Sequence, residues 1–257
     1  MLKRRIAIPC IIISLFCATG LRSAESTETE EQEGRPDIFV GAGVVIRSKP
    51  FEGIDSKVYP VPLFGYEGER LYLRGISGGY RLIKAGGFSV GPTVRPRFEG
   101  YDASDSSALA GMKNRNATVD GGIDVAWRTD WGLLSAVTVT DMLGAHDGYE
   151  IELSYTARFT RANFDFIPGF ALTWRNSNLV DYYYGVKTSE ARAGRPAYSP
   201  DAALTPLVRL AIQRDLKKRW GLLFATQYEW LASEMRDSPI VDDDGILSVL
   251  LGVTYSF

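Results

Sequence analysis

The sequence predicts an all-β protein, an antiparallel transmembrane β-barrel of about 12 strands of the outer-membrane type. Three observations lead to this prediction. Apolar and polar residues alternate at period two in repeated segments from residue 37 onward, the polar face of these segments carries charges, and short and long links alternate between them. An apolar exterior around an ionic, wet interior is typical of outer-membrane barrels, whereas a soluble sandwich usually has shorter strands.

The amino terminus has the features of a secretory signal peptide, which we place at residues 1–24. Three basic residues at positions 3–5 precede a short apolar run, and small residues follow it and leave the cleavage point open. Both cysteines, Cys10 and Cys17, lie in this segment. The mature chain is therefore predicted to contain no disulfide and no cysteine-ligated metal.

Residues 25–36 are acidic and contain no aromatic or branched aliphatic side chain, which predicts a solvated, disordered arm. Removal of the four basic residues in 1–24 from the total of 29 leaves 25 against 31 acidic residues, a net charge of about −6. This acidity argues against nucleic acid as a partner. The partners that we expect are outer-membrane lipid and the outer-membrane assembly machinery.

Alternating segments follow one another through residues 37–257, the predicted barrel. In one of them Tyr149, Ile151 and Leu153 share a face opposite Glu150 and Glu152. We find no convincing helical stretch and no apolar run long enough to span a bilayer as a helix. The clearest alternating segments are residues 117–130, 148–160, 163–175, 219–230 and 245–257.

The links divide into two classes that predict the orientation of the barrel. If residues 70–84 form two short strands that turn near Ser77 and Gly78, about twelve strands result. All long links then lie at one end, and the tight turns and both termini lie at the other, as in single-chain outer-membrane barrels. The tight links are at 67–69, 85–86, 130, 161–162 and 215–218, and the long links are at 48–56, 101–116, 143–148, 176–201 and 233–245.

Prolines conflict with this strand assignment, because a proline has no N–H for the ladder. Bulges and strand ends could accommodate some of them, but the sequence offers no account of Pro92 and Pro96 so close together. The prolines within predicted strands are Pro60, Pro62, Pro92, Pro96, Pro168 and Pro206.

Several motifs resemble the MipA/OmpV family of Gram-negative outer-membrane proteins. They are the F-E-G-x-D loop at 51–55, the paired Pro60 and Pro62, the D-S-P-I-V stretch at 237–241, and "YYYGV" followed by "GRPAY". The resemblance runs from about Asp37 to Phe257. It implies that the paired prolines are a family feature.

The resemblance also implies a function. The family's namesake is a scaffold between a murein transglycosylase and a penicillin-binding protein, so the expected role is a scaffold that binds murein-degrading and murein-synthesising enzymes. Other members are linked to adhesion, osmotic response or antibiotic sensitivity, so a small-solute channel and an adhesin or stress-response barrel remain alternatives. The family has no defined catalytic residue, and we expect neither enzymatic activity nor a cofactor.

Charged residues on the polar faces are the candidates for lining the lumen. Charges of both signs could line a solute path, but mixed signs more often indicate internal ion pairing. The candidate lumen charges are Arg95, Arg97, Asp124, Arg128, Glu150, Glu152, Arg158 and Arg209.

Three loop features have a chemical interpretation beside a structural one. His146 with Asp147 could be a general-base dyad, with Asp242–Asp244 as further acidic residues, but a polar loop turn is the favoured interpretation. Asp242–Asp244 lacks the ligand spacing of a calcium loop, so solvated loop charge is favoured there. Tyr182–Tyr184 could stack on a sugar or pack within a loop, with neither favoured. We therefore predict no catalytic, cofactor or metal site.

The last strand carries the final candidate. Val253, Tyr255 and Phe257 share the apolar face and end in an aromatic, a pattern that resembles the signal read by the outer-membrane assembly machinery. The alternative is that Phe257 only anchors the strand at the interface, as Trp220 would.

Overall fold

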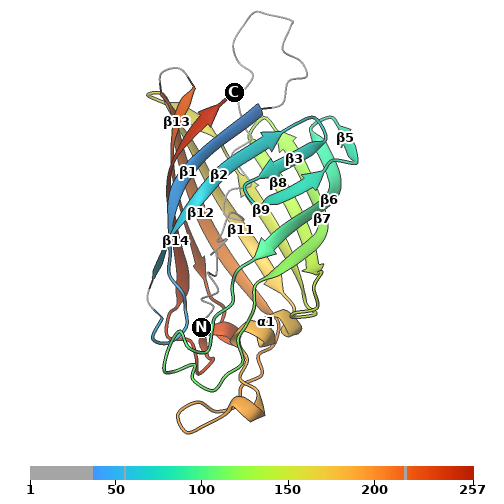
Figure 1. Cartoon of the computed structure of the whole chain (residues 1–257). Coiled ribbons are helices and arrows are strands. Elements are labelled where there is room, and N and C mark those ends of the chain that lie inside the picture. The colour runs from blue at the N-terminus through green and yellow to red at the C-terminus, as the bar shows by residue number, and fades with distance from the viewer. Residues whose placement is uncertain (1–36, 55, 217–218) are drawn as a thin grey trace, which may run out of the picture.

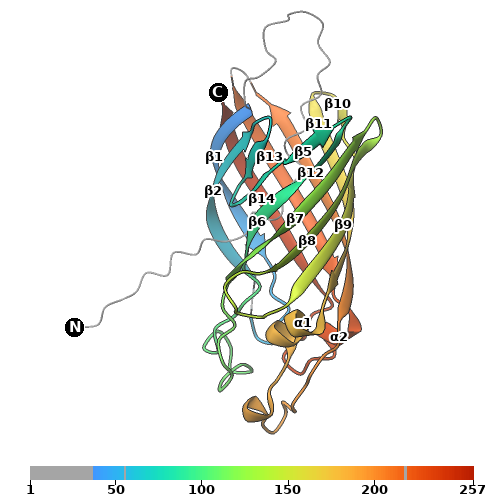
Figure 2. The same cartoon turned by 90° about the vertical axis from the view of Figure 1, so that its right-hand side faces the viewer.

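The computed structural model describes residues 37–54, 56–216 and 219–257 and shows an antiparallel β-barrel with strongly tilted strands (Figures 1 and 2). The predicted signal peptide at 1–24 and acidic arm at 25–36 lie outside the described residues. β4 with β5, and β9 with β10, each form one interrupted strand, so the wall has the twelve strand positions that the sequence predicts. The strands are β1 Asp37–Arg47, β2 Lys57–Glu67, β3 Leu71–Arg74, β4 Ser77–Tyr80, β5 Ile83–Ala85, β6 Phe88–Arg97, β7 Thr118–Thr129, β8 Gly132–Asp141, β9 Tyr149–Thr156, β10 Phe159–Arg161, β11 Phe164–Arg175, β12 Ala203–Asp215, β13 Trp220–Trp230 and β14 Gly245–Ser256.

The first and last strands close the barrel. β1 pairs with β14 over nine residues, from Phe39 opposite Ser256 to Arg47 opposite Ser248. Sequence neighbours pair around the rest of the wall, and β9 pairs with β11 where β10 ends. Closure removes the free edges that an open sheet would expose to lipid.

Short turns lie at one end of the barrel and long loops at the other, as predicted, except for the turn between β3 and β4, which lies within the wall. Figure 2 shows the turns and the C-terminus at the top and the helices within the loops at the bottom. We call these two ends the turn end and the loop end. In outer-membrane barrels of this architecture the turn end faces the periplasm and the loop end the cell exterior.

Side chains alternate between lipid and lumen as the sequence predicts. On β14, Leu247, Leu251 and Val253 are exposed on the outer surface, whereas Ser248 and Leu250 between them are buried. The outward face is a continuous apolar band, so its exposure to water would be unfavourable in free energy.

Three short helices in the loops were not predicted. They are α1 Ser177–Tyr184, the 3₁₀ helix η2 Thr188–Glu190 and α2 Ser233–Arg236. α1 begins at Asn176, whose side chain accepts a hydrogen bond from the Leu179 N–H. Eight residues give too little helical periodicity to detect, and the helix depends on tertiary packing. Within the described ranges, none of the helices has the length and apolar character to cross a membrane.

The predicted split of residues 70–84 exists, but its turn lies two residues earlier than predicted. β3 and β4 turn at Gly75 and Ile76, where Gly75 has a φ of 62°. A left-handed conformation favours glycine, and the Gly78 and Gly79 pair that suggested the turn lies within β4 instead. Each arm of this hairpin has four residues and is too short to span the membrane.

The strand prolines lie where the ladder does not require their N–H. Pro92 faces a bulge, because three residues (80–82) oppose two (91–92) between the pairs of β6 with β4 and β5. Pro168 lies opposite the break between β9 and β10, and Pro206 lies just beyond the last β12–β13 pair. Pro60, Pro62 and Pro96 border a part of the wall that is described below.

Aromatic side chains gather at the turn end of β13 and β14. The ring centroids of Trp220 and Tyr255 are 5.2 Å apart, those of Tyr255 and Phe257 are 5.4 Å apart, and Phe257 is 68% exposed. Val253 is also on the outer face. We propose that Val253, Tyr255 and Phe257 form the recognition signal for the assembly machinery.

Replacement of Phe257 separates the recognition signal from an interfacial anchor. Phe257→Ser should reduce outer-membrane abundance and increase periplasmic degradation, while the molecules that do insert keep their normal stability. An anchor would instead contribute about 1–3 kcal/mol of burial, which a closed barrel tolerates. Quantitative immunoblotting of membrane fractions tests this, with Trp220→Ser as the matched change at the same interface. Normal abundance with a lowered melting temperature would show that Phe257 is an anchor.

Candidate functional site

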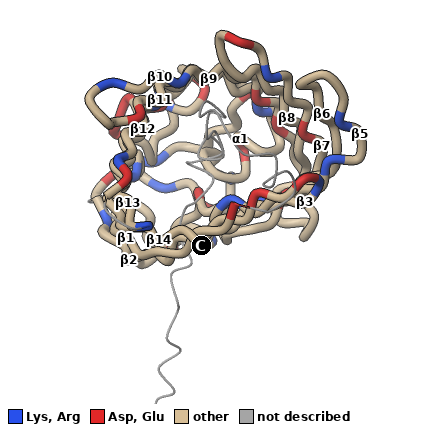
Figure 3. Tube along the Cα trace, turned by 90° about the horizontal axis from the view of Figure 1, so that it is seen from above, with Lys and Arg blue, Asp and Glu red and all other residues tan. Residues whose placement is uncertain are grey.

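The loops pack together into one hydrophobic cluster, which we call the loop core. It is formed by side chains from the loops at 48–56, 98–117, 176–202 and 231–244 and from adjoining strand ends. Looking along the barrel from the turn end, Figure 3 shows α1 across the bore. The loop core therefore covers the loop end of the lumen. Its buried members are Phe51, Ile54, Tyr101, Leu109, Met112, Leu179, Val180, Tyr183, Tyr184, Val186, Ala203, Leu231, Met235, Ile240 and Ile246.

A buried ion pair joins two of these loops. The Arg115 Nη2 and the Glu190 Oε2 are 2.9 Å apart, and both side chains are at most 4% exposed. Glu190 also accepts hydrogen bonds from the backbone N–H groups of Lys113 and Lys187. Burial by itself would raise the pKa of Glu190, but these donors outweigh it and lower the pKa to about 2.

A second buried system, which we call the lumen network, lies inside the barrel on the turn-end side of the loop core. Glu150 on β9 is at its centre and accepts from three arginines on two other strands. The Glu150 Oε2 is 3.1 Å from the Arg97 Nη1 and 2.8 Å from the Arg175 Nε, and the other oxygen pairs with Arg95. Because β6 and β11 are not neighbours of each other, these contacts connect separate parts of the wall across the bore.

The network extends in both directions from Glu150. Arg97 also pairs with Asp120 on β7 at 2.6 Å. Arg175 pairs with Glu229 on β13 at 2.7 Å. The members of each pair are at most 9% exposed, so water screens these charges only weakly.

The structure divides the predicted lumen charges into two groups. Arg95, Arg97 and Glu150 lie in the lumen network, and Arg209 pairs with Glu152 at 3.2 Å beside it. The others lie nearer the turn end. There Asp124 accepts a hydrogen bond from the Tyr72 hydroxyl, Arg158 pairs with Asp165, and Arg128 is exposed.

Sequence reasoning did not select Asp120, Arg175 and Glu229 as candidates. All three are on the polar faces of predicted strands, so alternation places them in the lumen. Their special position depends on which strand ends meet across the bore, and strand tilt and stagger determine that. A polar residue near the loop end of each of several strands is the signal that would have indicated them.

His146 has a different carboxylate partner from the predicted one. Its Nε2 lies 3.3 Å from the Asp120 Oδ1, and its Nδ1 accepts from the Gly148 N–H. Asp147 instead occupies a left-handed turn position with a φ of 49°. The His146 side chain is fully buried, so it cannot reach a substrate as a general base would have to.

Asp120, Asp141 and His146 have ligand atoms within 4.8 Å of one another and form a possible metal cluster in the described residues. Their lone pairs are already engaged. Asp141 accepts from the Thr118 hydroxyl and from three backbone N–H groups, including that of His146. Asp120 accepts from Arg97 and His146, and both imidazole nitrogens have partners. These hydrogen bonds connect β6, β7 and β8 to the loop that carries His146, and the cluster does not fit a metal site.

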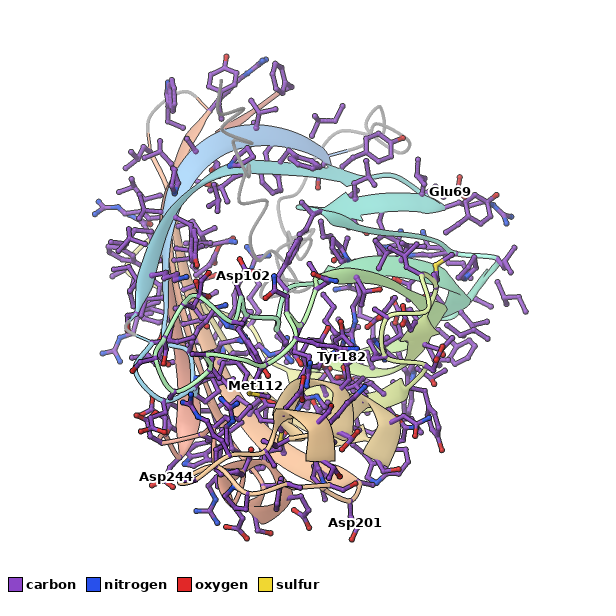
Figure 4. All side chains as sticks on the ribbon, turned by 60° about the horizontal axis from the view of Figure 1, so that its bottom comes forward. Glu69, Asp102, Met112, Tyr182, Asp201 and Asp244 are labelled. Carbon is purple, nitrogen blue, oxygen red and sulfur yellow. The ribbon has the colours of Figure 1, made fainter. Side chains whose placement is uncertain are left out.

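The remaining loop candidates are structural or solvated. Tyr183 and Tyr184 are buried in the loop core, which favours packing over sugar stacking. Asp244 lies at the outer edge of the loop end in Figure 4 and is 83% exposed. Partial burial and the charges of Asp242 and Asp244 raise the pKa of Asp243. These features agree with a solvated acidic loop.

A cavity of about 80 Å³ remains in the lumen beside the network. Five arginines and four glutamates line it. Arg47 is one of these arginines, and its guanidinium forms no ion pair or hydrogen bond with any of the described residues.

A tilted, closed β-barrel with an apolar exterior and an ionic interior defines an outer-membrane β-barrel protein. The chain belongs to the family described as MltA-interacting protein MipA, whose model matches residues 40–257. The protein is located in the cell outer membrane.

Two relatives that are similar in sequence agree with this assignment. The chain is 30% identical over 243 residues to the MltA-interacting protein of Escherichia coli (strain K12), covering 93% of this chain and 97% of the relative. It is 28% identical over 198 residues to the outer membrane protein OmpV of Vibrio cholerae, covering 76% of each. Among solved structures, an outer membrane channel from Pseudomonas putida covers 90% of this chain and is itself covered completely, with 10% identity and a TM-score of 0.43.

Removal of the central charge of the lumen network should destabilise the barrel. Glu150→Gln leaves three buried arginines without their shared carboxylate, and loss of one partner of a buried ion pair costs about 3–5 kcal/mol. Urea unfolding in lipid vesicles measures the change. Glu69→Gln, at an exposed turn, is the matched control and should change the free energy of unfolding by less than about 0.5 kcal/mol. A loss below about 1 kcal/mol for Glu150→Gln would show that the network contributes little to stability.

Acid should loosen the loop core through Glu190. Its folded pKa of about 2 lies below the ordinary value of 4.5, so the stabilisation is present above pH 4.5 and is lost as the pH falls towards 2. Limited proteolysis with an acid-active protease should show increasing cleavage of residues 98–117 and 186–200 in this pH range. In Glu190→Gln these loops should be cleaved at pH 5 and show less dependence on pH, whereas Glu52→Gln at an exposed position should behave like the wild type.

Proposed function

We propose that this protein is a non-conducting interaction protein of the cell envelope that binds murein-degrading and murein-synthesising enzymes. The observation that supports this most directly is the double obstruction of the lumen by the loop core and by the lumen network. A small-solute channel would require a continuous wet path. The bound enzymes, and not the barrel, carry out the chemistry in this proposal.

The printed name of the Escherichia coli relative supports a murein transglycosylase as a partner class. Murein lies in the periplasm, so the surface available to such enzymes is the turn end. Exposed charges of both signs lie there, including Glu69, Arg70 and Lys84. Mixed charges at an exposed rim are suited to orienting a partner rather than to burying a large apolar area.

Conductance in a planar bilayer separates the proposed function from a channel. The intact protein should give little or no steady conductance. A variant in which residues 177–200 are replaced by a short Gly-Ser linker and both Arg97 and Arg175 by alanine lacks α1 and the centre of the lumen network. It should give larger or more frequent openings, which shows that the assay detects an opened lumen. Large, steady conductance from the intact chain would favour a channel and contradict the proposal.

Affinity capture from detergent-solubilised envelopes tests the partners. The intact protein should retain a murein transglycosylase and a penicillin-binding protein. Charge reversal at the turn end, Glu69→Lys with Lys84→Glu, should reduce retention severalfold, because rim charges act mainly on association. Asp201→Lys, an exposed reversal at the loop end (Figure 4), is the matched control and should leave retention unchanged. Equal loss in both variants, or retention of neither enzyme, would contradict the proposal.

A further inference from the structure

Two strand edges face each other in the barrel wall without a strand between them. β2 pairs with β1 along its whole length but with β3 only at residues 65–67. β6 pairs with β7 from end to end, but β4 reaches only Thr93 and Val94. In the described part of the chain, residues 57–63 and 95–97 therefore have no ladder partner on the facing sides. Figure 1 shows this break at the front, between β2 and the end of β6.

The break has a closed perimeter, and we call it the lateral window. At its turn-end side the Gly75 N–H donates to the Phe64 carbonyl at 2.9 Å. At its loop-end side two loops hold the edges together, since Lys57 pairs with Asp105 at 3.2 Å and the Lys49 Nζ donates to the Gly100 carbonyl at 2.6 Å. The six steps of about 3.3 Å from residue 57 to residue 63 give the window a height of about 20 Å along β2. It lies in the half of the wall nearer the loop end, at the level of the outer leaflet.

The prolines lie on the two edges of this window. The Phe64 carbonyl points toward the β3 side, so the other even-numbered residues of β2 point their backbone groups the same way. Two of these residues are Pro60 and Pro62. Phe88 pairs with Ala85 across the β5–β6 hairpin, so the backbone of Pro96, which has the same parity, points into the window from the opposite side. Both edges thus present carbonyl groups and few N–H groups.

This polarity restricts what can occupy the window. A β-strand cannot add to an edge whose donors are missing, so pairing with another chain is disfavoured. Bare carbonyl groups facing hydrocarbon are also unfavourable, because no donor satisfies them there. The occupant must therefore bring its own water or polar groups, or the edge must border a hydrated lumen.

The groups behind the window are apolar near β2 and cationic near the loop end. Tyr59 and Phe98 are half-buried and pack against the apolar lumen cluster that includes Val61 and Leu63. Arg47, opposite Lys57 in the β1–β2 ladder, lines the adjoining cavity and has no counter-ion in the described residues. The charge lies at the loop-end corner of the window, at the depth of the head groups. The apolar surface runs from there toward the middle of the bilayer.

We propose that the lateral window binds an anionic lipid of the outer leaflet, with the head group at Arg47 and one acyl chain along Tyr59 and Phe98. The order of charge and apolar surface along β2 matches the order of head group and chain in a leaflet. The head group also carries the water that the carbonyl edges require. This inference does not depend on the proposed interaction with murein enzymes.

Photolabelling in phosphatidylcholine vesicles tests the site. The probes are a photoactivatable palmitate and the corresponding long-chain alcohol, which has the same chain without the charge. Peptides that contain residues 57–64 and 94–98 should be labelled by palmitate severalfold more than the outer face of β14, which any annular lipid contacts. Equal labelling around the whole outer surface would overturn the proposal.

Substitution of Arg47 tests the head-group contact. Arg47→Gln should lower window labelling by palmitate about tenfold, because a charge-assisted hydrogen bond is lost, and should leave labelling by the alcohol unchanged. Arg47→Lys keeps the charge and should retain most of the labelling. Arg70→Gln, an exposed arginine at the turn end, is the matched control and should have no effect. Equal loss with both probes, or equal loss in Arg47→Lys and Arg47→Gln, would overturn the assigned role of Arg47.

Discussion

The structure depends on one constraint, the need to satisfy every backbone polar group within a bilayer. The nine-residue pairing of β1 with β14 meets this constraint, because it converts a sheet with two open edges into a barrel. Closure also fixes which residues face lipid and which face the lumen. Among the described residues, the lateral window leaves two strand edges unpaired, and it has prolines on both of them, so the chain limits its unpaired donors there.

Closure of the barrel also creates an enclosed interior, and the side chains of the lumen occupy it. A barrel of twelve strands encloses space that must be filled by water or by side chains. Near the loop end this chain fills the space with charges that neutralise one another, with Glu150 shared among three arginines. Such a network is stable only when all its members are present, since a buried charge that loses its partner is strongly unfavourable. The lumen is therefore a structural element that couples strands which are distant in the wall.

The sequence predicted the features that follow from local periodicity. Alternation assigned Leu251 and Val253 to lipid and Glu150 to the lumen, and link length assigned the two ends of the barrel. Features that depend on contacts between distant segments could not be predicted. α1 requires the loop core to exist, and the meeting of Arg97 with Glu150 depends on strand tilt.

The prolines show the boundary between these two kinds of prediction. In the sequence, Pro92 and Pro96 only conflicted with a strand. In the structure, Pro92 lies opposite a bulge and Pro96 lies on an unpaired strand edge, because β4 and β5 are interrupted and short. The rule that proline is unfavourable within a strand thus indicated a real irregularity in the wall. Only the pairing with β4 and β5 shows that this irregularity is a bulge at Pro92 and an unpaired edge at Pro96.

The loop core has a consequence for how the cell surface is recognised. Residues from four separate loops pack into the loop core, so the exposed surface at the loop end is a single folded unit. An antibody or a bacteriophage that binds this surface contacts residues far apart in the sequence and recognises their relative positions. Peptides copied from one loop would lack that arrangement and make poor immunogens. Escape from such a binder is also restricted, because a substitution that remodels one loop disturbs the packing of the other three.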